Sequence, residues 1–523
     1  MMNTLLYKAT LLFFVLFTGF GVSVGGQNSF PYFTTGNSAT EFTVIPSTGG
    51  SGSAVVGANN KGVRLTTNRA SQHGGVILSN LTFTTAKGFV VSFEYEMSGA
   101  QTSGFKGGDG LAMVLFDGSV ANPSLGAFGS GLGYAYAEGT SSIYKKPGFS
   151  KGYMAVALDY YGNFHRRRDQ GDDARNGVEL GTDEHKSFIS IRGPHNSSDP
   201  LKGYPVLFTR STQHLEGQVR RLTTDVSDPD YASAKYKSYM DILPFDFSIQ
   251  NNAYSEDPAR NGYRKVIISL LPGLSDRGEK VFYLTLKIQH ETFVTTIVED
   301  FIFYEEKNIR YKEINKSYIT TPSRDVIADI LFKTPSTLKM AFTASTGAAY
   351  QAHYVRNIGV TLPFSPITAD DLRENLCYSC GTSSIVVFYN DLGYKSNIYT
   401  PGIPSENGNE YLNYDTFRFK VYDPATGQYI KTPNPYEHTI AHLGTFKYVN
   451  TGDVSSHVTF TPDPAVVASG IYPTEAVIHY DIKNKNPLIA TDEYRSNTSK
   501  ITLKFNPQKQ KKYLIVNGDY RGL

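Results

Sequence analysis

Polar and apolar residues alternate with a period of two along much of the chain, which predicts β-strands. Residues 89–97 show this pattern clearly, because Val91 and Phe93 lie on one face and polar residues lie between them. Two other segments, 111–116 and 154–159, are unbroken apolar runs, as expected of strands buried on both faces. Further strands are predicted at 263–271, 281–288, 338–344 and 355–362, and downstream at 385–389, 417–422, 458–461, 476–482, 501–505 and 513–516.

A proline-rich break divides this series of strands into two parts. Pro363-Phe-Ser-Pro366 interrupts the pattern, so we place a domain boundary there, with 364–376 as the linker. The length of 523 residues exceeds what one compact core usually accommodates, which supports more than one domain. We expect a large β-domain at 27–363 and a smaller β-sandwich at 377–523.

The amino-acid composition supports the β class and limits the kinds of partner molecule that are expected. Tyr (36), Phe (32) and Gly (48) are abundant, which favours strands and turns over helices. A long polar loop is expected at 165–187, a short helix is a candidate near 228–241, and 368–374 is expected as linker or a brief helical turn. The formal net charge is +2 and no long Lys/Arg stripe is present, so nucleic acid is not an expected partner.

The first 26 residues have the composition of a signal peptide. Lys8 supplies the positive charge, 9–22 is apolar, and small residues at 24–26 precede an expected cleavage before Gln27. An uncleaved anchor is the alternative, although the apolar run is short for a membrane span. No later segment has the 18 or more apolar residues that a membrane helix needs, so no transmembrane segment is expected in the mature chain. We expect an exported protein that is secreted, periplasmic or held at the cell surface.

The chain has two cysteines, Cys377 and Cys380. In an exported protein a local disulfide between them is the expected state. A thioredoxin-like redox role would need a helix after the first cysteine, and a zinc site would need a second cysteine pair.

Four separate segments carry Asp, Asn and Gly residues at expected strand ends and turns. They are Gly107-Gly-Asp-Gly-Leu-Ala-Met-Val-Leu115, Phe128-Gly-Ser-Gly-Leu-Gly-Tyr134, Met154-Ala-Val-Ala-Leu-Asp-Tyr-Tyr-Gly-Asn163 and Leu338-Lys-Met-Ala-Phe-Thr-Ala-Ser-Thr-Gly-Ala-Ala-Tyr-Gln-Ala-His-Tyr-Val355. Their order and spacing resemble the L-type (legume-lectin-like, concanavalin-like) lectin family over residues 28–363, and bacterial surface members most of all. The resemblance implies a concanavalin-like jelly-roll β-sandwich followed by a smaller C-terminal β-sandwich domain.

The resemblance also implies a carbohydrate-binding site. In the family, the residue matching Asp109 accepts hydrogen bonds from two sugar hydroxyls, and the residue matching Asn163 donates its amide to another. A sugar hydroxyl both donates and accepts hydrogen bonds, so an Asp acceptor beside amide donors can bind it in both ways. The loop backbone at Gly129 and Gly131 would also contact the sugar. The specificity loop would be formed by Gly347, Ala348 and Ala349.

The same resemblance implies a Ca²⁺ site, since Ca²⁺ prefers several oxygen ligands. Asp159, the Tyr161 carbonyl and Asn163 match three ligands of the family. At the commonest spacing of the fourth ligand this sequence has Arg167, so Asp169, Asp172 or Asp173 would have to serve in a longer loop. The transition-metal site of plant members is expected to be lost, because Ala157 and Phe188 stand where its Glu and His would be, and either a single-Ca²⁺ site or a metal-free site remains.

Each of these residues also has a purely structural explanation. Asp109 is a suitable cap for a Gly-rich turn, and Asp159 and Asn163 are common strand-end residues. His353 is expected to make a structural hydrogen bond. The Arg166–Arg168 run is expected in a solvated loop, with a preference for acidic glycans as the alternative.

Three functions follow from these observations. The first is non-catalytic glycan binding by the 27–363 domain, with a role in adhesion or surface recognition and an unknown partner for the C-terminal domain. The second is a structural or interaction surface protein that has lost sugar binding. The third is a glycoside hydrolase, which needs two carboxyls flanking the scissile bond. Glu94 and Glu96 share a strand face, but the Glu-x-Asp-x-x-Glu motif of jelly-roll hydrolases is absent, so an enzyme is not expected.

Overall fold

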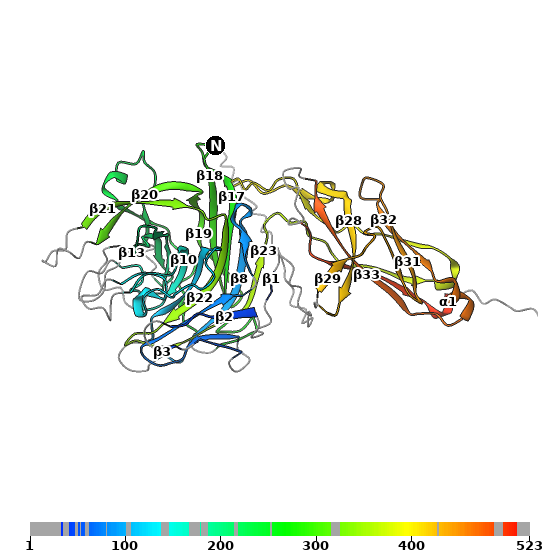
Figure 1. The fold of residues 1–523 in the computed structure, drawn as a ribbon, viewed down its shortest axis with the longest axis horizontal. Helices are drawn as coiled ribbons and strands as arrows, with labels where there is room; N and C mark the ends of the chain where they lie inside the picture. Colours follow the sequence, from blue (N-terminus) through cyan, green and yellow to red (C-terminus); the bar gives the residue numbers. More distant parts are fainter. Residues whose placement is uncertain are drawn as a thin grey trace, which may run out of the picture.

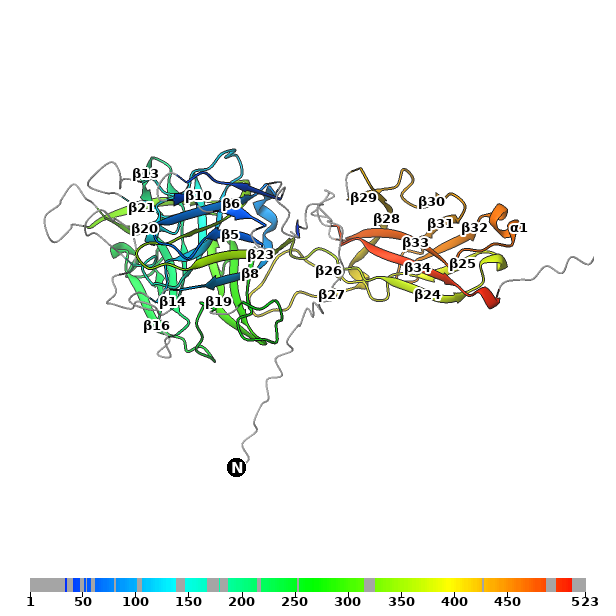
Figure 2. The ribbon, with the colours of Figure 1, turned by 90° about the horizontal axis from the view of Figure 1, so that it is seen from below.

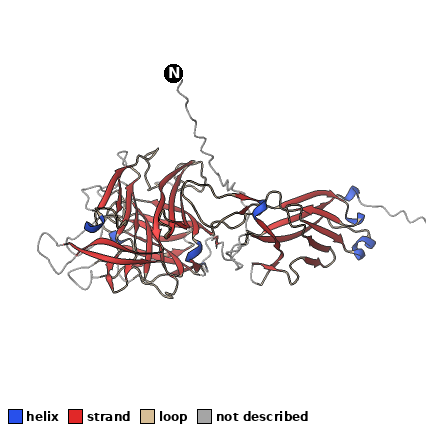
Figure 3. Ribbon diagram, turned by 90° about the horizontal axis from the view of Figure 1, so that it is seen from above, coloured by secondary structure: helices blue, strands red, loops and turns tan. Residues whose placement is uncertain are grey.

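The computed structural model is built almost entirely of β-strands (Figures 1 and 3). It describes residues 33–34, 41–47, 51–52, 54–57, 62–79, 81–100, 106–137, 146–166, 178, 187–213, 218–251, 254–314, 325–425, 428–485 and 495–509. The expected signal peptide at 1–26 and the strand predicted at 513–516 lie outside these residues. None of the helices in the described part is long and apolar enough to cross a membrane.

Two sheets form the N-terminal sandwich. The first has the order β19 (Phe293–Tyr304), β18 (Lys280–His290), β17 (Arg264–Leu274), β8 (Phe89–Ser98), β23 (Ala352–Thr361), β5 (Val63–Thr66) and β4 (Val55–Val56), and β1 (Phe33–Thr34) pairs with β23. The second has the order β16 (Tyr236–Met240), β15 (Gln218–Leu222), β14 (Val206–Ser211), β11 (Phe188–Arg192), β10 (Gly152–Asp159), β9 (Gly110–Asp117), β22 (Thr337–Ser345), β6 (Gln72–Leu78) and β2 (Phe42–Val44), with β3 (Ser51–Gly52) on β6 and β7 (Phe83–Thr84) on β22.

Short elements complete this sandwich. They are the pairs β12 (His195–Asn196) with β13 (Asp199–Gly203) and β20 (Glu306–Ile314) with β21 (Asp325–Lys333), and the 3₁₀ turns η3 (Thr85–Lys87), η4 (Gly129–Gly131) and η5 (Tyr231–Ser233). The helix expected at 228–241 is wrong, because the segment contains only the turn η5 followed by strand β16. β16 is an edge strand that pairs with β15 alone, so sheet pairing rather than helix periodicity determines its structure.

The core explains the apolar runs in β9 and β10. One face of β9 packs between the two sheets, in a cluster that includes Leu111, Met113 and Leu115. The opposite face belongs to a second cluster, which also contains aromatic residues of the segment after β9; its members include Ala112, Val114, Phe116, Tyr134, Tyr136, Phe149, Ala155 and Ala157. Both faces of these strands are therefore buried, which is why they show no polar alternation.

The C-terminal sandwich has its own core and two sheets (Figure 2). One sheet has the order β24 (Asp371–Leu376), β34 (Ser499–Phe505), β33 (Glu475–Asn484), β28 (Leu412–Asp423) and β29 (Gln428–Lys431). The other has the order β25 (Ser383–Val386), β32 (His457–Pro462), β31 (Gly444–Val449) and β30 (Glu437–Ile440). The remaining elements are β26 (Gly393–Tyr394), β27 (Asn407–Gly408), α1 (Pro464–Ser469), η6 (Tyr378–Cys380), η7 (Asn409–Tyr411) and η9 (Pro507–Lys509).

The segment expected as a linker is partly structured. Residues 371–376 form β24, which pairs in parallel with β34 and so belongs to the C-terminal sheet. Most of its side chains are exposed, so the segment shows no apolar alternation. The linker expected at 364–376 is therefore too long by these six residues.

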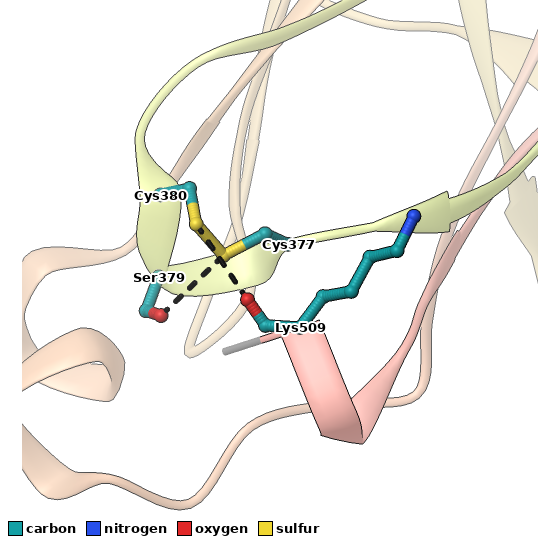
Figure 4. The surroundings of a disulfide bond; sticks show 4 residues. All are labelled: Cys377, Ser379, Cys380 and Lys509. Carbon is teal, nitrogen blue, oxygen red and sulfur yellow. Dashed lines mark hydrogen bonds between the residues drawn. A yellow bond between two sulfur atoms is a disulfide. The ribbon is translucent and has the colours of Figure 1, made fainter. Parts of the chain in front are cut away.

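The disulfide expected between Cys377 and Cys380 is confirmed. It closes the turn η6 directly after β24, and Cys380 Sγ lies 3.8 Å from the Lys509 carbonyl of η9 (Figure 4). Because η6 is followed by a strand and not by a long helix, the setting of a thioredoxin-like cysteine pair is not present here.

Candidate functional site

The predicted site lies where three neighbouring strands end. Gly110, the first residue of β9, pairs with Asp159 of β10 on one side and with Ser345 of β22 on the other. The Asp109 N–H donates to the Ser345 carbonyl at 3.0 Å, and the Tyr161 N–H donates to the Asp109 carbonyl at 3.1 Å. The backbone of Asp109 is thus held by the last residue of β22 and by the segment that follows β10.

The Asp109 carboxylate is the point where the predicted sugar-binding segments converge. Its Oδ1 accepts a hydrogen bond from the Asn163 amide Nδ2 at 3.2 Å. A Cβ added at Gly347 would lie 3.3 Å from Oδ2, and one added at Gly129 would lie 3.8 Å from it. Segments separated by up to about 240 residues in the chain therefore meet around one carboxylate.

The site is recessed. Asp109 is 3% exposed and Asn163 is 7% exposed, whereas Ala348 beside them is exposed and Gly347 is half-buried. The carboxylate is therefore almost fully covered, and Ala348 is the exposed residue of the neighbouring loop.

Close packing shapes the two loops that flank the carboxylate. The Ser345 hydroxyl donates to the Gly129 carbonyl and ties the turn η4 to the end of β22. Gly131 lies against Ala127, where a Cβ would approach to 2.8 Å. Ala349 is buried against Gly108, and a Cβ at Gly108 would meet its side chain at 2.7 Å. Larger residues at these glycines would move the loops apart.

A chain of buried polar side chains supports the Gly347–Ala349 loop from behind. His353 Nδ1 lies 2.6 Å from the Thr66 hydroxyl, and His353 Nε2 lies 3.2 Å from Gln351 Nε2. Gln351 Oε1 in turn accepts from Gln250 Nε2, which also donates to the Lys106 carbonyl. Burial lowers the pKa of His353 to about 3, so the ring is neutral. The structural role expected of His353 is confirmed by these contacts.

The Asp159 carboxylate is enclosed by donors from the segment that follows it. Oδ1 accepts from the N–H groups of Gly162 at 2.9 Å and Asn163 at 3.3 Å. Oδ2 accepts from the Phe164 N–H at 2.8 Å and lies 3.3 Å from His165 Nδ1. Asp159 is fully buried, and these donors satisfy the hydrogen-bonding capacity of its carboxyl oxygens.

Two residues of this region were missed in the sequence, His165 and Arg192. The His165 ring packs against Phe188 with centroids 3.9 Å apart, and burial lowers the pKa of His165. Arg192 is fully buried, donates from Nε and Nη2 to the Phe164 carbonyl, and lies over the Phe164 ring. The sequence does contain a signal for Arg192, because it is a charged residue at the end of the apolar segment Phe188-Ile-Ser-Ile-Arg192.

The donor set fits Ca²⁺ poorly in the described part of this loop. A cation bound to Asp159 would share the carboxylate with N–H groups whose positive ends already point at it. The contact of Asn163 Nδ2 with Asp109 does not involve the amide oxygen, which is the atom that a cation would bind, and Asp169, Asp172 and Asp173 lie outside the described residues. Among the described residues no group of three or more His, Cys, Asp or Glu side chains is arranged to hold a metal ion. Arg166 is half-buried rather than fully solvated, and Arg167 and Arg168 are not described.

The two glutamates weighed as a catalytic pair are engaged in structural contacts. Glu94 accepts from the Tyr263 hydroxyl at 3.2 Å and from Asn357 Nδ2 at 2.9 Å. Glu96 accepts from the Ser98 hydroxyl and lies 3.4 Å from Arg356 Nη2. Both glutamates are buried, and their carboxylates make these structural contacts on the face of β8 that is opposite the core.

The fold and the site together define a β-sandwich protein with a recessed Asp–Asn pair framed by glycine loops. No protein-family model matches the chain, and no curated protein matches it. Among solved structures the chain is similar to three lectins at low identity. They are a lectin from Bauhinia forficata in complex with GalNAc (13% identity, 63% of this chain, 96% of that chain, TM-score 0.29), peanut lectin with a 9mer peptide (13%, 63%, 95%, 0.30) and the Ca²⁺-bound exoplasmic/lumenal domain of VIP36 (12%, 62%, 84%, 0.28). The all-β class expected from the sequence is confirmed by the described strands.

Proposed function

We propose that the N-terminal sandwich binds glycans without catalysis at the site around Asp109. The contact between Asp109 Oδ1 and Asn163 Nδ2 carries this proposal, because it places an acceptor and a donor within reach of one sugar hydroxyl. Gly129 and Gly347 are half-buried, and a Cβ at either position would lie within 4 Å of Oδ2, so a larger side chain there would crowd the carboxylate. Export and a role in adhesion belong to the same proposal, supported by the signal-peptide composition of residues 1–26.

Replacing the carboxylate tests the site directly. Asp109→Asn is isosteric but exchanges an anionic acceptor for an amide, so glycan affinity should fall by about 1.5–3 kcal/mol, or roughly 10- to 150-fold. A glycan array followed by titration with the best ligand measures this loss. Asp117→Asn at the opposite end of β9 is the matched control and should bind as the wild type does. Equal loss in both variants would contradict the assignment.

A larger side chain beside Oδ2 should have the same effect without removing a polar group. In Gly347→Val the new methyl groups would occupy the region within about 3–4 Å of the Asp109 carboxylate, which a ligand hydroxyl needs. We expect affinity to fall at least about tenfold while the melting temperature changes little, since Gly347 is only half-buried. Unchanged affinity would place the ligand elsewhere.

The main alternative is a surface protein that no longer binds sugar, and the low exposure of Asp109 and Asn163 favours it. A glycan array with no ligand for the purified chain, with or without added Ca²⁺, would support this alternative. Release of reducing ends from a bound glycan would instead support a hydrolase.

A further inference from the structure

We propose that the Asn163 side chain is oriented by protein contacts from Asp159 and Arg192 rather than by a bound cation. The inference rests on the proposed function, because Asn163 is taken as a donor to the ligand. It makes Asp159 and Arg192 positioning residues of that site, and it makes glycan binding insensitive to chelators.

The first argument is a count of hydrogen-bonding positions on Asp159. An ionised carboxylate offers about four lone-pair positions on its two oxygens. Backbone N–H groups of residues 162, 163 and 164 and the His165 ring occupy positions on both oxygens, two on each. A cation at Asp159 would have to displace at least one of these donors, and it would face the positive ends of the others.

The second argument concerns the residue that follows Asn163. Arg192 directs two nitrogens, Nε and Nη2, at the Phe164 carbonyl, and its Nη1 donates to the Tyr204 carbonyl. Tyr204 is itself fixed through its hydroxyl, which donates to the Phe149 carbonyl at 2.9 Å. The planar guanidinium thus connects the loop to the body of the sandwich, a geometry that a lysine cannot reproduce.

Asp159 and Arg192 hold the backbone on either side of the Asn163 side-chain amide. Asp159 fixes the backbone N–H groups of residues 162–164, and Arg192 fixes the carbonyl of residue 164. Asn163 lies between these fixed points, and its side chain reaches Asp109 at 3.2 Å. These protein contacts restrain the loop in the way that a bound divalent ion would otherwise do.

The first test needs no glycan. Hydrogen–deuterium exchange of the segment 159–166 is measured on the purified chain after treatment with EDTA, and again with millimolar Ca²⁺. We expect equal protection in both conditions. Protection that appears only with Ca²⁺, and that is lost in Asp159→Asn, would overturn the proposal.

The second test uses variants. Arg192→Met should increase exchange in 159–166 and weaken glycan binding at least about tenfold, with Arg192→Lys giving only partial recovery. Arg210→Met is the matched control, because Arg210 is an equally buried arginine of the adjacent strand β14 that contacts Asp241 and Ile297 instead. It should lower stability without a selective change in 159–166. Selective loss of protection in Arg210→Met, or none in Arg192→Met, would contradict the role of Arg192.

The outcomes separate this inference from the proposed function. Absence of glycan binding in the wild type, with chelator-insensitive protection of 159–166, would refute sugar binding and leave the anchoring of the loop intact. Glycan binding that EDTA abolishes and Ca²⁺ restores would support sugar binding and refute the cation-independent loop.

Discussion

Raising the pH from about 5 to about 9 is expected to destabilise the C-terminal sandwich by about 2–4 kcal/mol. The cause is a pair of carboxyls, the half-buried Asp371 and the buried Asp391, that meet at the Tyr480 hydroxyl. This hydroxyl lies 2.8 Å from Asp391 Oδ2, 3.1 Å from Asp371 Oδ2 and 3.1 Å from the Val387 carbonyl. A hydroxyl donates one hydrogen, so it cannot satisfy two ionised carboxylates and a carbonyl together.

The direction of the effect follows from the pKa values. Burial, and then the charge of Asp391, raise the pKa of Asp371 to about 8, and Asp370 adds to the effect. Burial raises the pKa of Asp391 to about 7. The folded state therefore holds protons that the unfolded chain releases above about pH 4, so stability falls between about pH 4 and pH 8 and is level beyond.

Denaturant unfolding followed across this pH range measures the effect. In Asp371→Asn the pair cannot ionise fully, so the variant should resemble the wild type at about pH 5 and exceed its stability at about pH 9. Partial exposure of Asp371 is the reason for expecting less than the full linkage energy. A wild-type stability that rises with pH in the transition of this sandwich would contradict the assignment.

The second large effect is expected from Asp481→Asn, which should cost about 3–5 kcal/mol of folding free energy. Asp481 is buried and accepts from Arg418 Nε at 2.8 Å and Arg495 Nε at 2.7 Å, with Lys420 Nζ 3.5 Å away. Removing the negative charge leaves three cations close together in a largely buried setting. Because Arg418 and Arg495 come from different segments, the loss should also loosen the connection of residue 495 to β28.

Thermal or urea unfolding measures this loss. The control is Glu374→Gln, which breaks the exposed pair of Lys504 Nζ and Glu374 Oε1 at 2.9 Å and should change stability by less than about 1 kcal/mol. A similar, small effect of both substitutions would show that the Asp481 cluster is open to solvent in solution.

Strands β8 and β9 of the N-terminal sandwich were predictable because their pattern is local, whereas others such as β6 and β14 were not predicted. Residues 89–97 alternate since one face of β8 meets the core, and 111–116 do not alternate since both faces of β9 are covered. Residues 236–240 and 371–376 were not recognised as strands because both lie at sheet edges with mostly exposed side chains, where burial imposes no pattern. Pairing with a neighbouring strand, and not side-chain periodicity, places these edges in their sheets.

The residues of the candidate site were likewise partly visible in the sequence, whereas their contacts depend on the tertiary structure. Asp109 and Asn163 stood out as polar residues at the ends of apolar strands, and the resemblance to lectins supplied their suggested roles. Their mutual contact of 3.2 Å spans 54 residues and depends on β9 and β10 being neighbours. The sequence shows that Arg192 is a charged residue at the end of an apolar segment, but nothing local reveals that it contacts Phe164 or that His165 contacts Asp159, and these contacts determine how the loop is held.

The sequence by itself determined the β class and the polar residues at the strand ends, and it predicted a two-part organisation, because burial of one strand face produces a period of two along neighbouring residues. Only the tertiary structure decided what those polar residues face. Asp159 looked like a cation ligand in the sequence, yet its carboxylate is enclosed by N–H groups of residues 162–164 and by His165. A carboxylate takes its partners from the chain segments that folding brings within about 3 Å, and no pattern along the sequence records that choice.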